Sequence, residues 1–396
     1  MAGSHGYNPI LVPGFSRVAH ADLPDAQSKG AAVVTEKYAG LGEQGLRERA
    51  GTVLHACHLL KPLQYMRSWW RRDLRIVAYH RVLSTFDADA FEFDLDLVSA
   101  SAAGFREQML LLKRRFNPMR LGDVVKAVTS GQSVSANAVV VTFDDGYDDN
   151  YRVAYPILRE LGVPATFFVS TGNIDSGLPY DYDWLVHMLL AATQPRITID
   201  ELAIDVPAPS TRISRRPLVN DVLRRLKMLD GSAQTALIAR LASDWRMPRE
   251  QPHPNCQPMN WQQLREMHAA GFEIGSHGVH HRMLAKLPQQ ELEFELRESK
   301  AVLERELGAP ASLIAYPVGG YTAFDDRVID ATISAGYQAA CSYVSGTNSL
   351  TGLRQYDLRR LAVERDMRLG WFDAMLTLPE WLSYTTSKHG NDSAHS

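Results

Sequence analysis

The sequence predicts an α/β fold built on parallel strands. Residues 138–143 and 165–169 are continuous runs of β-branched and aromatic residues, typical of strands buried on both faces of a sheet. Residues 154–161 between them have the pattern of a helix, and the turn at 162–164 follows, so this stretch indicates a strand–helix–strand unit. Strands and helices go on alternating as far as residue 342, which indicates a parallel sheet or barrel.

The main domain is expected to cover residues 73–384, because the composition becomes β-rich from Leu74 onward. Its first elements are a strand at 74–80 and a helix at 105–116. After the strand–helix–strand unit, the expected elements are helix 261–270, strand 272–275, helix 289–307, strand 312–316, helix 324–335 and strand 337–342.

Three segments lie outside this alternation. Residues 1–72 form an N-terminal extension, in which a helix is expected from Gly42 to Trp70. Residues from about 174 to 258 are rich in Pro and Arg, with helical patterns at 184–192 and 219–229, and are expected to form an insertion above the sheet. Residues 385–396 are polar and are expected to be a disordered tail.

The composition excludes several classes of protein. Lys and Arg number 42 against 45 Asp and Glu, without long charged runs, so the charge predicts binding neither to nucleic acid nor to an anionic membrane. Cys57, Cys256 and Cys341 lie too far apart for a disulfide framework or a Cys-rich metal site. No stretch is long enough to span a bilayer, and residues 1–13 lack an export signal, so we expect a cytoplasmic protein. The oligomeric state is not predicted.

Two adjacent carboxylates, Asp144 and Asp145, follow the strand at 138–143 and precede Gly146. Ionised acids are rarely placed at the end of a buried strand unless a cation or a proton relay compensates them. The alternative is that one of them caps the next helix, but a second acid beside it favours a chemical role.

Histidines follow another strand, at positions 277, 280 and 281. Imidazoles four residues apart lie on one face of a helix or can converge in a turn, and imidazole is a preferred zinc ligand. His277 and His281 with one aspartate would make a three-ligand site with open positions, typical of a catalytic ion, and His280 is an alternative ligand. The other aspartate would then be free to accept a proton. The sequence therefore predicts a hydrolytic site with one divalent ion, expected to be zinc.

Residues 142–146 (TFDDG) and 276–281 (SHGVHH), supported by 315–321 (AYPVGGY), resemble the motifs of the carbohydrate esterase family 4 polysaccharide deacetylases, which carry the NodB homology domain. The resemblance runs from Arg75 to Met367. It is strongest toward the exopolysaccharide-type members, whose motif order is circularly permuted. It implies a distorted (β/α)7 barrel, here with an insertion and an N-terminal helical extension.

The resemblance also implies roles for individual residues. Asp144 corresponds to the catalytic base, and Asp145, His277 and His281 correspond to the metal ligands. The implied reaction is the attack of metal-activated water on the acetyl group of an N-acetylated sugar or polysaccharide. Residues that would contact the substrate or the oxyanion are Tyr147, through its backbone N–H, Tyr316 and Pro317.

The chain departs from the family pattern at two points. Many members have an arginine that orients the base where this chain has Ala315, and Arg360 is a candidate replacement. Many members also have a C-terminal histidine as general acid, but here the last histidines, His389 and His395, lie in the polar tail. His80, which resembles the upstream histidine of the permuted members, is the candidate acid, and the alternative is a core or capping histidine.

Two other functions remain open from the sequence. One is a C–N hydrolase acting on a small non-sugar amide, and the other is a catalytically silent carbohydrate-binding relative. Tyr180, Tyr182 and Trp184 in the insertion would form a sugar-stacking wall or a small core of the insertion.

Overall fold

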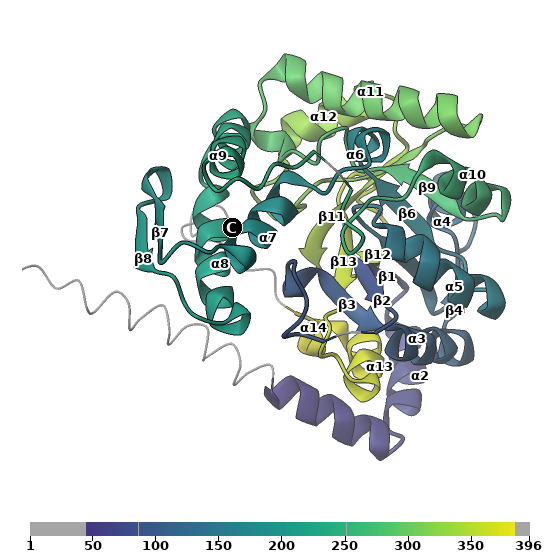
Figure 1. The fold of residues 1–396 in the computed structure, drawn as a ribbon. Coiled ribbons are helices and arrows are strands. Elements are labelled where there is room, and N and C mark those ends of the chain that lie inside the picture. Colours follow the sequence, from purple (N-terminus) through teal and green to yellow (C-terminus); the bar gives the residue numbers. More distant parts are fainter. Residues whose placement is uncertain (1–44, 86, 251, 385–396) are drawn as a thin grey trace, which may run out of the picture. The chain divides into compact units, whose positions relative to one another are not determined.

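The computed structural model describes residues 45–85, 87–250 and 252–384 (Figure 1). Its contacts divide the chain into two units, Met1–Leu46 and Arg47–Ser396. Only residues 45 and 46 of the first unit are described, so the architecture below is that of the second. The predicted tail, 385–396, lies outside the described residues. Within the described part of the chain, no helix is both long and apolar enough to cross a membrane.

Seven parallel strands close into a barrel. They are β1 (Asp73–Tyr79), β5 (Ala138–Phe143), β6 (Thr166–Val169), β9 (Glu273–Ser276), β10 (Leu313–Ala315), β11 (Ala339–Ser345) and β13 (Leu358–Ala362). The barrel closes at β1, where Val77 pairs with Val141 of β5 on one side and with Leu361 of β13 on the other. The expected (β/α)7 barrel is therefore confirmed.

The barrel is irregular at two joints, which accounts for its distortion. β9 and β10 are joined through a single pair, Ile314 with Ser276, and the register between β11 and β13 shifts between Cys341 and Ser345. The remaining short strands lie outside this ring: β2 (Arg81–Leu83) pairs with β3 (Val98–Ser101), while β4 (Asn117–Pro118) and β12 (Asn348–Ser349) extend the sheet.

The strands form where the sequence is continuously apolar. All six residues of β5 are buried, and the ring of Phe143 stacks on that of Phe167 of β6, with centroids 4.7 Å apart. Burying a side chain of this size stabilises the folded state by about 1.5–3 kcal/mol. Both faces of β5 pack in the core, so the strand itself exposes no side chain for polar chemistry. The first carboxylate, Asp144, follows directly after its carboxyl end.

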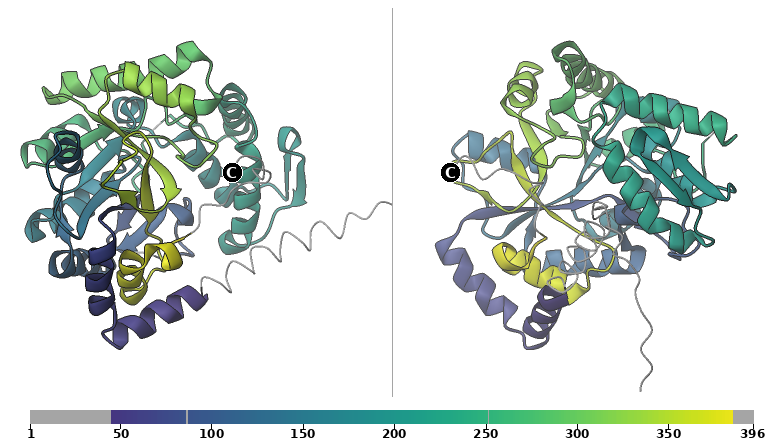
Figure 2. Two further views of the ribbon diagram at one scale, coloured as in Figure 1. Left: turned by 180° about the vertical axis from the view of Figure 1, so that it is seen from behind. Right: turned by 90° about the vertical axis from the view of Figure 1, so that its left-hand side faces the viewer.

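Helices surround the strands, as Figures 1 and 2 show. They are α3 (Ala102–Arg115), α4 (Leu121–Thr129), α5 (Tyr155–Leu161), α10 (Trp261–Ala269), α11 (Gln289–Leu307), α12 (Asp326–Ser334), α13 (Leu369–Thr377) and the short α14 (Pro379–Leu382). The bounds of α3, α5, α10, α11 and α12 agree with the predicted helices to within a few residues, whereas α4, α13 and α14 were not predicted. α12 begins after Phe324, the predicted start, because the Asp325 side chain accepts a hydrogen bond from the Val328 N–H and caps the helix.

The prediction of one continuous helix from Gly42 to Trp70 is wrong, because the helix is interrupted. Residues 45–56 are helical, and α2 (Leu60–Trp70) follows after a break. His58 has a left-handed φ of 57°, and the Leu59 N–H donates to the carbonyl of Leu54, which is the geometry of a Schellman helix end. Residues 42–44 lie outside the described part.

The segment between β6 and β9 carries its own small core. Helices α7 (Asp181–Ala191), α8 (Arg212–Leu226) and α9 (Gly231–Asp244) pack around Leu185, Val222 and Ile238, beside an antiparallel hairpin of β7 (Arg196–Ile199) and β8 (Ile204–Pro207). Figure 2 shows this group beside the barrel. α7 and α8 overlap the two helices expected there, while the hairpin was not expected. The domain limits at 73–384 and 174–258 stay predictions.

Candidate active site

The chemically active side chains gather where the barrel strands end. A pocket of about 700 Å³ opens there, and its lining includes His80 after β1, Asp144 and Asp145 after β5, and His277 after β9. Carboxyl ends of parallel strands meet at one edge of a barrel, so residues far apart in sequence become neighbours at this mouth. Helices α8 and α9 and the loop before α7 supply the opposite wall of the pocket.

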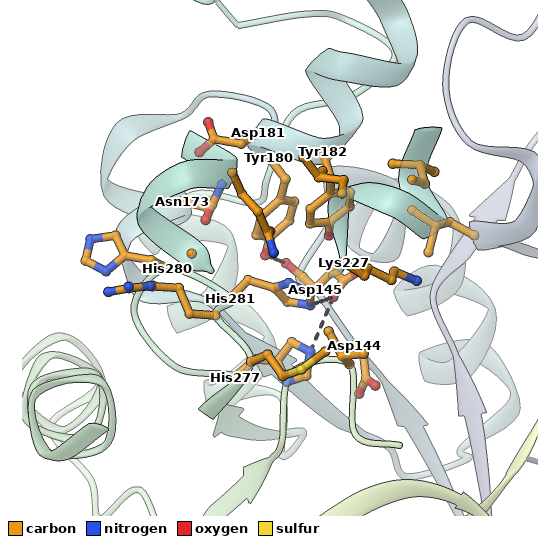
Figure 3. Close-up of a pocket in the computed structure, with 18 of the residues that line it drawn as sticks. Asp144, Asp145, Asn173, Tyr180, Asp181, Tyr182, Lys227, His277, His280 and His281 are labelled. Carbon is orange, nitrogen blue, oxygen red and sulfur yellow. Dashed lines mark hydrogen bonds and ion pairs between the residues drawn. The ribbon is translucent and has the colours of Figure 1, made fainter. Parts of the chain in front are cut away.

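Asp145, His277 and His281 form a compact cluster in this pocket (Figure 3). Oδ1 of Asp145 lies 3.3 Å from Nε2 of His277 and 3.2 Å from Nε2 of His281. The candidate ligand atoms of the three residues all lie within 4.8 Å of one another. Two imidazole nitrogens and one carboxylate oxygen are a donor set that suits a zinc-like divalent ion.

Further features of the cluster fit a cation. Asp145 Oδ1 is buried and has no hydrogen-bond partner among the described residues. Burying an oxygen without a partner is unfavourable, and a bound cation would compensate for it. Nδ1 of His277 lies 2.8 Å from the carbonyl oxygen of Ala315. A carbonyl only accepts, so the ring proton is on Nδ1, and the Nε2 lone pair faces Asp145.

The backbone around the cluster adopts conformations that are unusual for these residues. Asp145 and His281 have left-handed φ angles of 71° and 55°. Gly146 has a φ of 72°, and a Cβ atom there would come within 2.8 Å of a side-chain carbon of Val169, so only glycine fits. Such strain is concentrated at functional sites, where the surrounding structure enforces it.

Glu295 of α11 fixes the histidine loop, which carries His277, His280 and His281. Its Oε2 accepts hydrogen bonds from the backbone N–H groups of Val279 (2.7 Å) and His280 (3.0 Å), and its Oε1 lies 2.7 Å from Nδ1 of His280. The His280 ring is therefore held by Glu295, away from the Asp145 cluster, whereas His277 and His281 point into it. Sequence reasoning missed Glu295, since an acid in the middle of a long polar helix carries no local signal.

Asp144 lies beside the cluster and pairs with Arg360 of β13. Nη1 and Nη2 of Arg360 each donate a 2.7 Å hydrogen bond to one carboxylate oxygen, and Nε donates to the carbonyl of Ser342. Both side chains are buried. Burial acts to raise the pKa of Asp144, but the charge and hydrogen bonds of Arg360 outweigh it and hold the pKa below its usual value. Asp144 is therefore ionised at neutral pH.

His80 follows β1 and lines the same pocket. Its backbone is fixed on both sides, because its N–H donates to Oγ of Ser99 and its carbonyl accepts from Nδ2 of Asn150. Its ring lies next to that of Tyr343, with centroids 5.4 Å apart. Burial lowers the pKa of His80, although the charges of Asp145 and Asp144 act in the opposite direction.

Tyr147 directs its side chain away from the pocket. Its hydroxyl donates a 2.7 Å hydrogen bond to Oδ2 of Asp183 on α7, and Sγ of Cys256 donates to the same oxygen. Burial, opposed by Arg81 and Tyr147, raises the pKa of Asp183 to about 7. The Tyr147 backbone N–H, next to Asp145, has no acceptor among the described residues. Asp183 therefore anchors the loop that carries this N–H, a role that no sequence motif indicated.

The other sequence-selected residues differ in position. Tyr316 lines the pocket and donates its hydroxyl hydrogen to the carbonyl of Tyr356, whereas Pro317 is not among the lining residues. Tyr180 and Tyr182 line the pocket too; their rings stack with centroids 5.1 Å apart, and both flank His281. Trp184 instead packs in the core of the insertion.

A second group of metal-type side chains, Glu92, His187 and His253, lies outside this pocket. Nδ1 of His253 accepts a hydrogen bond from the Asn255 N–H, which places the ring proton on Nε2, 3.5 Å from a carboxylate oxygen of Glu92. A protonated nitrogen donates to a carboxylate and offers no lone pair to a metal. We therefore assign this group to a polar contact between the insertion and the loop that carries Glu92.

Fold and site together define a (β/α)7 barrel protein with a carboxylate–histidine cluster at the mouth of the barrel. The sequence model of the polysaccharide deacetylase family matches residues 131–340, which is more than half of the chain, and the chain belongs to this family.

Individual relatives are distant. YxkH of Bacillus subtilis (strain 168), whose name assigns it provisionally to this family, is 22% identical over 249 residues, 63% of this chain and 60% of that protein. The match therefore spans less than two thirds of that relative. Among solved structures, the Streptococcus pyogenes deacetylase PplD, in complex with acetate, has a TM-score of 0.51 at 16% identity, covering 79% of this chain and 100% of that one. A de-N-acetylase from Aggregatibacter actinomycetemcomitans has a TM-score of 0.50 at 19% identity, covering 78% and 100%. At these identities the likeness concerns the fold.

Proposed function

We propose that this protein is a metal-dependent deacetylase that removes acetyl groups from an N-acetylated sugar or polysaccharide. The observation that carries the proposal is the placement of an ionised, buried Asp144 directly beside the Asp145–His277–His281 cluster, at the bottom of an open pocket. Asp145, His277 and His281 would hold one divalent ion, with zinc the expected metal because of the two imidazole donors. When bound, such an ion would polarise the acetyl carbonyl and lower the pKa of a water molecule.

The chain's own residues would then handle the protons and the charge. Asp144, kept ionised and fixed in orientation by Arg360, would accept the proton of the attacking water. The Tyr147 N–H would donate to the oxyanion that develops on the acetyl oxygen. The amine that leaves is a poor leaving group and needs a proton, for which His80 is the candidate donor.

The pocket itself supports a carbohydrate substrate. Its volume of about 700 Å³ lies within the range of sites that enclose small ligands. The partly exposed ring of Tyr182 stacks on the buried ring of Tyr180 and stands next to His281, where it would offer an apolar surface to the face of a sugar ring while the acetyl group points to the cluster. The likeness to a de-N-acetylase in fold is consistent with an acetyl group on nitrogen.

The proposal is tested by incubating the purified protein with N-acetylglucosamine oligomers, O-acetylated xylan and a small non-sugar amide. Acetate and free amine are measured for each substrate. We expect both products from the oligomers, in equal amounts, and little acetate from the other two. Turnover of the small amide alone would favour the C–N hydrolase alternative, and no turnover of any substrate by metal-loaded protein would favour the silent carbohydrate-binding alternative.

A further inference from the structure

One face of helix α2 is apolar and exposed. Pro62, Tyr65, Met66, Trp69 and Trp70 recur at i, i+3, i+4, i+7 and i+8, so they share one side of the helix. The exposed fractions are 62% for Tyr65, 53% for Met66, 72% for Trp69 and 84% for Trp70. Large apolar side chains grouped in this way on a surface mark an interaction site.

The opposite side of α2 is fastened to the barrel. Leu60 and Gln64 are buried there, and Nε2 of Gln64 donates to the carbonyl of Arg115. Arg67 donates to both carboxylate oxygens of Asp73 and to Glu380. The exposed face therefore belongs to a helix whose orientation is fixed, and it does not result from a loosely attached segment.

The apolar face has a basic rim. Glu380 of α14 pairs with Arg67 and Arg71 on the fastened side of α2. Lys61 and Arg72 are exposed at the two ends of the helix. We call Pro62, Tyr65, Met66, Trp69 and Trp70 the α2 face.

We infer that the α2 face docks onto a lipid bilayer that carries anionic headgroups. Tryptophan and tyrosine rings prefer the level of the headgroups, where an apolar ring and a polar edge are both accommodated. Lysine and arginine at the rim complement anionic lipids. A second copy of the chain is a poorer partner, because a symmetric contact through this face would bring two basic rims together.

Docking of this kind leaves the candidate active site accessible. α2 leads into the amino-terminal end of β1 at Asp73 (Figure 1). His80 and the pocket lie at the carboxyl end of β1. The inference therefore does not depend on the proposed deacetylase activity. It places the protein at a membrane surface, although none of its described helices is able to span a membrane.

The test is co-sedimentation of the full-length protein with vesicles of pure phosphatidylcholine and with vesicles that contain about 30% phosphatidylglycerol. We expect binding to the anionic vesicles that weakens as salt is added. The variant Trp69→Ser/Trp70→Ser should lose at least about tenfold in vesicle affinity. The matched control Ile213→Ser/Met228→Ser removes two exposed apolar side chains of the insertion and should bind as the wild type does.

The oligomeric state is measured by light scattering in the same samples without vesicles. Equal vesicle binding by the wild type and Trp69→Ser/Trp70→Ser would overturn the inference, as would a failure of the wild type to bind. A dimer that dissociates in the tryptophan variant would assign the α2 face to self-association instead. Unchanged melting temperatures would show that both variants are folded.

Discussion

Arg360 donates two hydrogen bonds of 2.7 Å to the two carboxylate oxygens of Asp144, across 216 residues of sequence. The planar guanidinium can donate two parallel hydrogen bonds to a carboxylate only when both side chains are held in a fixed orientation. Here β13, which carries Arg360, and β5, which precedes Asp144, lie on either side of β1 in the barrel. The pair keeps a buried acid beside the Asp145 cluster ionised and fixes its orientation. We propose that Arg360 takes the place of the arginine that is missing at Ala315.

The first prediction concerns Arg360→Gln. Removing the charge leaves burial to act on Asp144 with less opposition, so its pKa rises. A general base acts in its ionised form, so the acid limb of the pH profile of kcat/KM should move to higher pH. At a given pH on that limb, the rate should fall about tenfold for each unit by which the pKa rises. The buried carboxylate would also lose its partner, at a cost of about 3–5 kcal/mol in stability. The control Arg359→Gln, on the neighbouring residue of β13, should keep the wild-type profile.

A profile of Arg360→Gln that overlays the wild type would exclude a role in setting the charge of Asp144. Because the glutamine variant is destabilised, Arg360→Lys serves as a second test. Lysine keeps the positive charge but cannot donate two parallel hydrogen bonds. It should preserve the acid limb better than glutamine does and still lower kcat, through poorer orientation of the base.

The second prediction concerns Asp144→Asn. The amide cannot accept a proton from water, so the rate should fall by about two to four orders of magnitude while the bound metal is retained. Metal content and activity are measured on the same preparation. If the variant loses the metal instead, Asp144 is a ligand, and the roles of Asp144 and Asp145 are exchanged.

The third prediction separates the histidines of the loop after β9. His277→Ala and His281→Ala each remove one of three ligands and should abolish stoichiometric metal binding. His280→Ala is the matched control from the same loop, because its ring is held by Glu295 and not by the cluster. Retention of metal by His277→Ala or His281→Ala, or its loss only in His280→Ala, would refute the ligand assignment. Elemental analysis after dialysis measures the outcome.

The fourth prediction concerns His80, which as a general acid must be protonated. Burial lowers its pKa, so activity should decline with rising pH through a pKa below the ordinary histidine value of about 6.5. With the pKa of Asp144 also low, the optimum should lie on the acid side of neutrality. His80→Asn should lose the descending limb and reduce turnover of amides more than that of aryl acetates, whose leaving groups need no proton. Equal losses on both substrates would remove His80 from the mechanism.

Local sequence patterns predicted the strands and helices whose own residues form a continuous apolar or amphipathic pattern. The continuous apolar run 138–143 coincides with β5, and the long amphipathic segment 289–307 coincides with α11. The helix break at His58 was missed, because that residue has no special preference for the left-handed conformation. The chain turns there, and Leu60 is then buried beside Ala374 and Leu382, far along the sequence.

The site was predictable to the extent that its residues lie in contiguous motifs. Asp144, Asp145, His277 and His281 follow two strands directly, so the topology alone brings them to one edge. Asp183 and Glu295 act through tertiary contacts with Tyr147 and with the histidine loop, and neither carries a local signal. The burial of Arg360 likewise depends on the closing of the barrel, which no single segment reveals.

The most direct test of the central claim is a metal titration of the chelator-treated protein, with acetate release from N-acetylglucosamine oligomers as the readout. The account predicts that the metal-free protein is inactive and that activity rises in proportion to added zinc, reaching a plateau at about one ion per chain. The same titration of His277→Ala should stay at the baseline. Full turnover by the metal-free protein, or restoration of His277→Ala by one equivalent of zinc, would contradict the account.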